Sequence, residues 1–570
     1  MRQRWTSSLG RGLALASLMA GLASPASAQR LGGATTGNPA VATQRFDNLA
    51  PPPPPISRST EGPSVSGIPI EKATPGDPTK FFVKRVVFEG STNLAPATLA
   101  KLASEYENRE VSLGELNILA RRVRAALRAK GFLVADAVVP SQTVEGGTVK
   151  LVISDGRYGK LTVRGNHHYC ERFIKRMFGP ALDRRVVNSK DLYKSLLILN
   201  EYPDLVVQAQ FSPGKEVGTT DVVLRVKDER PVHVGLDYNN FGNRLVGQSR
   251  LGVTLWAGNS FVDGDEVLLR AVEPFPGHVD VLANVGYLRP ISKYGDKAGF
   301  QYASAKTHAN GALSALGIRG DADIYSFVLS HPLMRTFQEV RNLTFALSAK
   351  TVRNFVFDQT KLSQDDLREL VIGHDGSRGD KNGRWIHALT ITQGLGTALG
   401  GRGNGDPLSS RVGAGDSFTK ANLDVLRSQD LKKDRTLLLK LSGQLSTKAL
   451  PTAEQFAVGG PDSVRGFIQG ERLGDDGYIV SAEYRQQVWK SKKGHDIVQA
   501  CGFLDHGNGD LRLPQVGEVH EKGLTGVGVG ARAGFGQNTS LRLDLGMPIS
   551  QHRDVDGNRV ELYAQAATRW

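Results

Sequence analysis

The stretch "TLLLKLSGQL", residues 436–445, alternates side chains of two kinds, as a β-strand with two different faces requires. One face carries Leu437, Leu439, Leu441 and Leu445, and the other carries Leu438, Lys440, Ser442 and Gln444. The stretch "SLRLDLGMP", residues 540–548, repeats the pattern with leucines opposite Arg542 and Asp544. Because strands of a soluble sheet also alternate in this way, the pattern alone leaves a soluble sheet and a membrane barrel both open.

The number and spacing of such runs favour the membrane barrel. From Pro231 onward about sixteen strand-like runs follow one another, and short gaps such as "KSKKGHD" alternate with long ones such as "LGTALGGRGNGDPLSSRVGAGD". The runs begin near residues 231, 249, 265, 279, 298, 322, 342, 368, 385, 416, 436, 477, 497, 524, 539 and 560. We therefore predict a 16-stranded antiparallel transmembrane β-barrel over residues 230–570. An even strand number puts both ends of the barrel on the periplasmic side.

The start of the chain indicates export. Residues 1–28 combine early arginines, an apolar run and the sequence Ala26-Ser27-Ala28, which predicts a cleaved signal peptide. Residues 29–79 form a Pro-rich linker in which Pro51 to Pro55 are consecutive. Within this linker "PAVATQRFDNLA", residues 39–50, is short and weakly amphipathic.

Two small α/β units lie between the linker and the barrel. Residues 80–156 and 157–229 share one order of elements, namely strand, helix, helix, strand and strand, which predicts α+β periplasmic domains. In the first unit Ser112 and Glu115 form the spacing of a helix capping box, and Gly131 suits the end of that helix. Both cysteines, Cys170 and Cys501, are expected to be buried and unpaired, because they fall in separate domains.

Searches for other chemistry give little. The net charge of +14 would permit nucleic-acid binding, but the basic residues are scattered and no recognition motif occurs, so we expect no nucleic acid as a partner. "HEKGL" at His520 lacks the second histidine of a zinc motif, and "DVDGN" at Asp554 has its glycine too early for a calcium loop. His167, His168 and Cys170 lack a fourth ligand. We expect no metal, no cofactor and no enzymatic activity.

Several short motifs occur in order along the chain. They are "KGFLVADAVVPSQTVEGGTVKLVISDG" at 130–156, "LLILNEYPD" at 196–204, "NNFGNRLVGQSRLGVTL" at 239–255 with Asn240, Gly242, Gly247 and Arg250, "GGPDSVRGF" at 459–467 and "GFLDHG" at 502–507. With these motifs the two α/β units resemble polypeptide-transport-associated (POTRA) domains. Residues 80 to 570 resemble the outer-membrane transporters of two-partner secretion, the TpsB family. One departure is Asp204, which stands where the family has glycine.

This resemblance implies a protein-translocating pore in the outer membrane of a Gram-negative bacterium. Its substrate would be a secreted TpsA-type exoprotein, haemolysin-like or adhesin-like, and POTRA domains in the periplasm would capture it. Capture by β-augmentation would use the second strand of each unit, "LVADAVV" and "LVVQAQF". The expected substrate contacts are Pro140, Gln142, Val138 and Val207. The other expected partner is outer-membrane lipid, and a monomer is favoured although the sequence leaves the oligomeric state open.

The resemblance also implies an N-terminal helix that plugs the pore, for which residues 39–50 are the one candidate, and it implies where the working residues of the pore lie. The sixth extracellular loop, about residues 447–476, would fold back into the barrel and place Arg465 beside Asp505. The implied loop anchor and barrel-wall residues are Val464, Arg465, Gly466, Phe467, Phe503, Asp505 and Gly507, with Gly459 and Gly460 in the loop backbone. Independently, a charge facing lipid would cost about 2 to 4 kcal/mol near the midplane, which favours an inward Asp505. An arginine can hold that carboxylate with two hydrogen bonds.

Two other functions remain open at this level. A barrel-assembly factor of the same superfamily would use similar POTRA units and a similar loop, although it usually carries more than two units. A passive porin would explain the barrel but would leave both periplasmic units and the "VRGF" step at residues 464–467 without a role.

Overall fold

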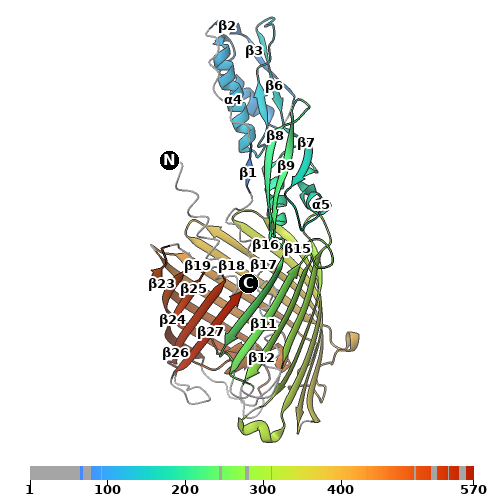
Figure 1. The fold of residues 1–570 in the computed structure, drawn as a ribbon, viewed down its shortest axis with the longest axis vertical. Coiled ribbons are helices and arrows are strands. Elements are labelled where there is room, and N and C mark those ends of the chain that lie inside the picture. The colour runs from blue at the N-terminus through green and yellow to red at the C-terminus, as the bar shows by residue number, and fades with distance from the viewer. Residues whose placement is uncertain are drawn as a thin grey trace. The chain divides into compact units, whose positions relative to one another are not determined.

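The computed structural model describes residues 64–67, 79–90, 93–242, 247–275, 281–309, 311–357, 359–432, 434–492, 496–514, 523–536, 538–550 and 560–570. The signal peptide, the candidate plug helix, His520 and Asp554 lie outside these residues. The chain divides into an α/β unit that ends at Arg230 and a barrel that begins at Pro231 (Figure 1).

Sixteen antiparallel strands close into one barrel, because the last strand pairs back to the first. In barrel order the strands are β10 (Val232–Asn239), β11 (Ser249–Gly258), β12 (Glu266–Phe275), β13 (Leu282–Pro290), β14 (Lys297–His308), β15 (Arg319–Arg335), β16 (Glu339–Val356), β17 (Thr360–Asp380), β18 (Gly383–Gly394), β19 (Thr419–Asp430), β20 (Arg435–Ser446), β23 (Asp476–Lys490), β24 (Ile497–Asp510), β25 (Leu524–Phe535), β26 (Thr539–Pro548) and β27 (Glu561–Arg569). The predicted 16-stranded antiparallel barrel is confirmed.

The predicted strand starts differ most from the structure at β17. This strand begins at Thr360 rather than near residue 368. Its first residues, "TKLSQDDL", are mostly polar, yet Ser363, Asp365 and Leu367 alternate with more exposed neighbours and face inward. Polar residues are tolerated there because this side of the strand faces the barrel interior and not lipid.

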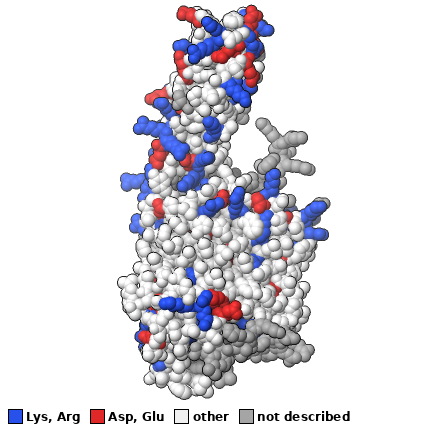
Figure 2. All heavy atoms as spheres, turned by 180° about the vertical axis from the view of Figure 1, so that it is seen from behind, with Lys and Arg blue, Asp and Glu red and all other residues white. Residues whose placement is uncertain are grey.

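The alternation in residues 436–445 separates an outer apolar face of the strand from an inner polar face. Leu439, Leu441 and Leu445 are 44%, 42% and 70% exposed, whereas Ser442 and Gln444 are each 1% exposed. On the face of the barrel shown in Figure 2, a broad band without charged residues lies between charged residues near the two rims. An uncharged outer band of this kind is the surface that a barrel presents to lipid.

The first α/β unit contains β2 (Lys80–Val83), β3 (Arg85–Gly90), α3 (Pro96–Ala103), β4 (Arg109–Ser112), α4 (Leu113–Ala129), β5 (Asp136–Val138) and β6 (Thr148–Ser154). Its main sheet has the order β3-β6-β5, which leaves β5 at an edge. The predicted capping box is present at the start of α4, where Ser112 and Glu115 bond each other's backbone N–H groups. The alternating run "FFVKRVVFEG", residues 81–90, looks like one strand in the sequence but forms two, because the strand is interrupted at Lys84 and β2 pairs separately with β4.

The second α/β unit contains β7 (Arg157–Arg164), α5 (Glu171–Leu182), α6 (Ser189–Leu199), β8 (Leu205–Pro213) and β9 (Thr219–Asp228). Its sheet has the order β1-β8-β9-β7, in which β1 (Val65–Ser66) comes from the linker and runs parallel to β8. This added strand was not predicted, because residues 29–79 were expected to form only a Pro-rich linker. The linker therefore already covers the outer edge of β8.

Two positions in the second unit differ from simple expectation. Cys501 is buried as predicted, but Cys170 is exposed. The Sγ of Cys170 accepts the Phe173 N–H at the start of α5, so this cysteine caps the helix. Asp204, found in place of the family's glycine, has a φ of +47°. The chain turn needs a left-handed residue there, and aspartate tolerates that conformation better than most side chains do.

No helix among the described residues is long and apolar enough to cross a membrane.

The two faces of β20 give a direct test. We expect Leu441→Arg to destabilise the barrel in lipid by about 2 to 4 kcal/mol, because the charge would face the apolar band near mid-strand. Folding into lipid vesicles, followed by the heat-dependent shift of folded barrels in gels, measures this loss. Lys440→Met changes the neighbouring inward residue and should fold normally, and equal folding of both variants would place Leu441 away from lipid.

Candidate functional site inside the barrel

The segment between β20 and β23 forms a hairpin-like arm that is buried against inward-facing residues of the barrel. We call residues 447–475 loop 6. Within it β21 (Phe456–Val458) pairs antiparallel with β22 (Arg472–Gly474), and every residue from 449 to 460 is buried. A loop this buried cannot be a freely solvated connection. Its contacts with the wall therefore decide its position.

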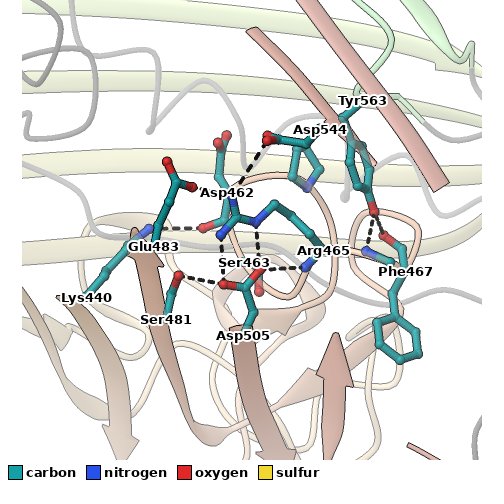
Figure 3. Close-up of polar contacts among 12 residues, drawn as sticks. Lys440, Asp462, Ser463, Arg465, Phe467, Ser481, Glu483, Asp505, Asp544 and Tyr563 are labelled. Carbon is teal, nitrogen blue, oxygen red and sulfur yellow. Dashed lines mark hydrogen bonds and ion pairs between the residues drawn. The ribbon is translucent and has the colours of Figure 1, made fainter. Parts of the chain in front are cut away.

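The far end of loop 6 is held by Arg465, which is 3% exposed. Its Nε donates to Asp505 Oδ2 at 2.7 Å and its second terminal nitrogen donates to Asp505 Oδ1 at 2.9 Å, so the pair is bidentate (Figure 3). The main-chain N–H of Arg465 also donates to Asp505, and a third side-chain bond reaches Glu483 on β23. The guanidinium carbon lies 3.4 Å from the centre of the Phe503 ring. The structure thus brings Arg465, Asp505 and Phe503 together.

Asp505 points inward from β24, on the same face of the strand as Cys501 and Phe503. It is 0% exposed, and it accepts a further hydrogen bond of 2.5 Å from Ser481 Oγ. Burial by itself would lower the pKa of Arg465, but the hydrogen bonds and the negative charge of Asp505 raise that pKa above its usual range. Arg465 is therefore a permanent cation.

A larger network of alternating charges surrounds this pair. Glu483 is bonded by Arg485 at 2.6 Å and approached by Arg532 at 3.2 Å. Asp544 on β26 is bonded by Arg532 and by Arg542, both at 2.7 Å. Arg542 reaches loop 6 again through Asp462. The network balances four arginines against four carboxylates, namely Arg465, Arg485, Arg532 and Arg542 with Glu483, Asp505, Asp544 and Asp462.

The residues on either side of Arg465 fix its backbone. Val464 and Phe467 are fully buried in an apolar cluster with Phe456, Val458, Ile479 and Leu524. Gly466 has a φ of +100°, and a Cβ there would lie 2.8 Å from the carbonyl carbon of Met547. Its N–H donates to the Tyr563 hydroxyl, which donates in turn to the Phe467 carbonyl at 2.6 Å (Figure 3). Only glycine can lie this close to the wall.

The remaining predicted glycines also lie at close approaches. Gly459 and Gly460 have φ values of +112° and +104°. A Cβ on Gly507 would lie 2.9 Å from Val458 on the arm.

Sequence reasoning missed several members of the network, among them Glu483, Arg532 and Tyr563. A signal was available, because all three lie at inward positions of strands that the alternation had located. The sequence does not show which residues lie next to each other on adjacent strands, because that depends on strand register. The pairing of Ser481 with Asp505 across β23 and β24 is an example.

The POTRA-type positions have mixed placements. Val138 on β5 is 44% exposed and accessible to a partner. The side chain of Val207 is fully buried, so a partner at β8 could reach only its backbone. Gln142 bonds both the N–H and the carbonyl of Lys150 at 2.8 Å, which fixes the segment after Pro140 along β6. Gln142 is therefore occupied within the domain.

The motif at residues 239–255 helps to close the seam between the first and last strands of the barrel. The Asn240 side chain donates to the Leu562 carbonyl at 2.8 Å and accepts the Ala564 N–H at 2.7 Å. The Gly242 N–H donates to the Gln248 carbonyl, and Arg250 is 8% exposed.

Comparison with known proteins gives two family matches. The model of the family described as "Haemolysin secretion/activation protein ShlB/FhaC/HecB" matches residues 218–533. The model described as "POTRA domain, ShlB-type" matches residues 81–156.

Individual relatives agree with these matches. The chain is 24% identical over 492 residues to the heme/hemopexin transporter protein HuxB of Haemophilus influenzae, covering 83% of this chain and 84% of that protein. It is 26% identical over 423 residues to the outer membrane transporter CdiB of Dickeya dadantii, covering 72% and 73%. The solved structure of CdiB from Escherichia coli is similar in fold, with a TM-score of 0.71 at 20% identity over 88% of this chain and 93% of that one.

Removing the central cation tests the attachment of loop 6. In Arg465→Ala the buried Asp505 would keep only neutral partners, and breaking such a pair costs about 3 to 5 kcal/mol. We expect loop 6 to detach and to become cleavable by protease in the folded barrel, with mass spectrometry locating the cuts. Asp462→Ala, which removes the half-exposed partner of Arg542, is the matched control and should stay resistant. A protease-resistant loop in Arg465→Ala would mean that Arg465 does not hold it.

Proposed function

Because the chain belongs to the haemolysin secretion/activation protein ShlB/FhaC/HecB family, we propose that it exports one large haemolysin-like or adhesin-like partner exoprotein by two-partner secretion. Members of this TpsB family are outer-membrane secretion pores rather than enzymes, and their POTRA domains lie in the periplasm. The observation that carries the proposal is the buried clasp of Arg465 on Asp505, which holds loop 6 inside the barrel.

A clasped loop fits a pore that must stay closed between substrates. An open barrel of this width would let small solutes leak, whereas a buried arm fills the interior until an exoprotein arrives. Release of the arm must break the Arg465 bonds to Asp505 and Glu483. The arm therefore acts as the gate. A passive porin has no use for such an attachment, which favours secretion over that alternative.

The first POTRA domain offers the more accessible strand edge for capture. The outer N–H of Ala137 on β5 bonds its neighbour Asp136 at 2.8 Å, and its carbonyl accepts from Arg124 at 3.2 Å. Arg124 and Asp136 also pair with each other at 2.7 Å, and the Asp136 side chain is 51% exposed. The Arg124 side chain is only 11% exposed, so an incoming strand would have to displace one exposed carboxylate and one mostly buried guanidinium, which are two side chains and not a paired strand.

The edge of the second domain is less open to a partner. β1 already pairs with β8, and Val65 packs against the buried core of this domain. We therefore place the entry of the exoprotein at β5, where an extended segment would add by backbone hydrogen bonds.

Direction would come from the cargo itself. The exoprotein would reach the periplasm unfolded and would fold after it emerges at the cell surface. A folded exoprotein is too wide for the pore, and unfolding it would expose its buried apolar surface to water, so return would be blocked. Such a mechanism needs no nucleotide.

Capture by the isolated periplasmic unit distinguishes the proposal from barrel assembly. We expect residues 57–230, used as bait in periplasmic extract, to retain one long exoprotein through its N-terminal region, as identified by mass spectrometry. Ala137→Pro removes the outward N–H without removing a bond to β6, so this variant should lose the captured protein. Thermal melting checks that the unit still folds, because the Ala137 side chain is buried in its core. Capture of many unfolded barrel proteins would instead indicate an assembly factor.

Secretion by the full chain tests the gate. We expect Arg465→Ala and Asp505→Ala to insert into the outer membrane normally but to export the captured exoprotein about tenfold less or worse, because each breaks a buried charged pair. Immunoblots of the culture medium and of the membrane fraction measure both steps. Asp462→Ala serves again as control, and normal export by both clasp variants would contradict the proposed gate.

A further inference from the structure

The wall of the barrel holds loop 6 at a second place, near the base of its arm. Glu454 is 1% exposed, and its carboxylate lies 3.0 Å from Lys350 Nζ on β16 and 2.5 Å from Lys420 Nζ on β19. Lys350 also lies 3.1 Å from Glu369 on β17, so two lysines face two carboxylates. This cluster lies on strands β16 to β19, whereas the Arg465 clasp lies on β23 to β26.

Other contacts hold the same part of the arm. Ala453 packs with Ala322, Val352 and Leu367 on the inner wall. Gln444 on β20 donates to the carbonyls of Glu454 and Asp475, both at 3.0 Å. Asp475 accepts the Leu450 N–H at 2.8 Å, which closes the neck of the loop, and it pairs with Arg411 at 2.7 Å. The base of the arm is thus bonded to the wall and to a neighbouring loop.

The two attachments differ in what remains when loop 6 leaves. If Arg465 withdraws, Glu483 keeps Arg485 and Arg532, and Asp544 keeps Arg532 and Arg542, but the fully buried Asp505 keeps only the neutral Ser481 hydroxyl. If Glu454 withdraws, the fully buried ammonium of Lys420 loses its one salt bridge among the described residues, and only the charge of Glu369 in the same cluster still acts on it. An uncompensated buried charge is strongly unfavourable. Each release therefore breaks one buried ion pair; the base is held in addition at the neck of the loop, by the Leu450 bond to Asp475 and by the packing of Ala453.

Glycines with positive φ separate the two attachments. Gly459 and Gly460 follow β21 on the outgoing chain, and Gly470, with a φ of +69°, precedes β22 on the returning chain. Glycine crosses between backbone conformations that other residues avoid, so both chains can turn at the same level. The segment beyond them, residues 461–469, carries Arg465 and is called the tip.

We propose that loop 6 opens as a jointed arm: Glu454 keeps the base clamped to the β16–β19 wall while the tip swings about Gly459, Gly460 and Gly470. Glu454 is then a positioning residue of the gate. This inference rests on the proposed function of loop 6 as a gate. It limits the motion to the tip, so the arm is not expelled as a whole.

Crosslinks at the two attachments test this motion by single-channel current in potassium chloride. The full chain would carry Arg465→Ala, to free the tip, with Cys170→Ser and Cys501→Ala to remove native thiols. One variant adds Ala453→Cys and Val352→Cys at the base, and the other adds Val464→Cys and Leu524→Cys at the tip. A short bifunctional thiol reagent joins each pair. We expect the base crosslink to leave channel openings unchanged and the tip crosslink to abolish them.

A base crosslink that closes the channel as fully as the tip crosslink would overturn the proposal. Absence of openings in the uncrosslinked Arg465→Ala protein would also overturn it, since a freed tip should unblock the interior. These currents involve no exoprotein, so a failure of the secretion proposal would leave their outcome valid.

A matched pair of substitutions isolates the role of Glu454. Glu454→Gln and Glu369→Gln remove the same charge from the same buried cluster, but only the first lies on loop 6. We expect Glu454→Gln to lower the yield of the base crosslink by about tenfold or more, because Lys420 loses its carboxylate. Glu369→Gln should keep the yield, since Lys350 retains Glu454. Equal yields in the two variants would show that Glu454 does not position the arm.

Discussion

A sheet in lipid finds no water for its backbone N–H and carbonyl groups, so it must close on itself, and the other main features follow from this constraint. Closure is completed where β27 pairs with β10, with Asn240 adding two side-chain bonds across the seam. A closed barrel of sixteen strands has an apolar outside and a polar inside that is too wide for its own side chains to fill. Loop 6 occupies that interior.

The interior then determines what kind of contact can hold the loop. Apolar packing alone would require an apolar lumen, which a protein-conducting pore cannot have along its whole length. Buried ion pairs offer an alternative, because they are strong and directional when dry and are solvated once water enters. In the Arg465 network Glu483 and Asp544 keep other guanidinium partners when the loop leaves, whereas the buried Asp505 keeps only the Ser481 hydroxyl. Most of the charge on the wall therefore stays paired when the gate opens, and Asp505 is the group that favours its return.

The periplasmic units follow a different principle. Their sheets have edges, and both edges suited to capture are protected, β8 by the linker strand β1 and β5 by the pair of Arg124 and Asp136. Protection keeps an exposed strand from pairing with unrelated chains. The kind of protection differs, since β8 is covered by a paired strand and β5 by two side chains, and this difference ranks the two edges as sites for a partner.

The sequence by itself determined the strands, their alternation, the capping box of α4 and the motifs around Arg465 and Asp505, because each of these depends on spacing along one segment. It did not locate β1 on β8, the start of β17 at Thr360, or the partners Glu483, Arg532 and Glu454. Those depend on which inward residues become neighbours once the barrel closes. Strand register and closure set these neighbours over separations of a hundred residues, such as Lys350 with Glu454, so only the tertiary structure decided them.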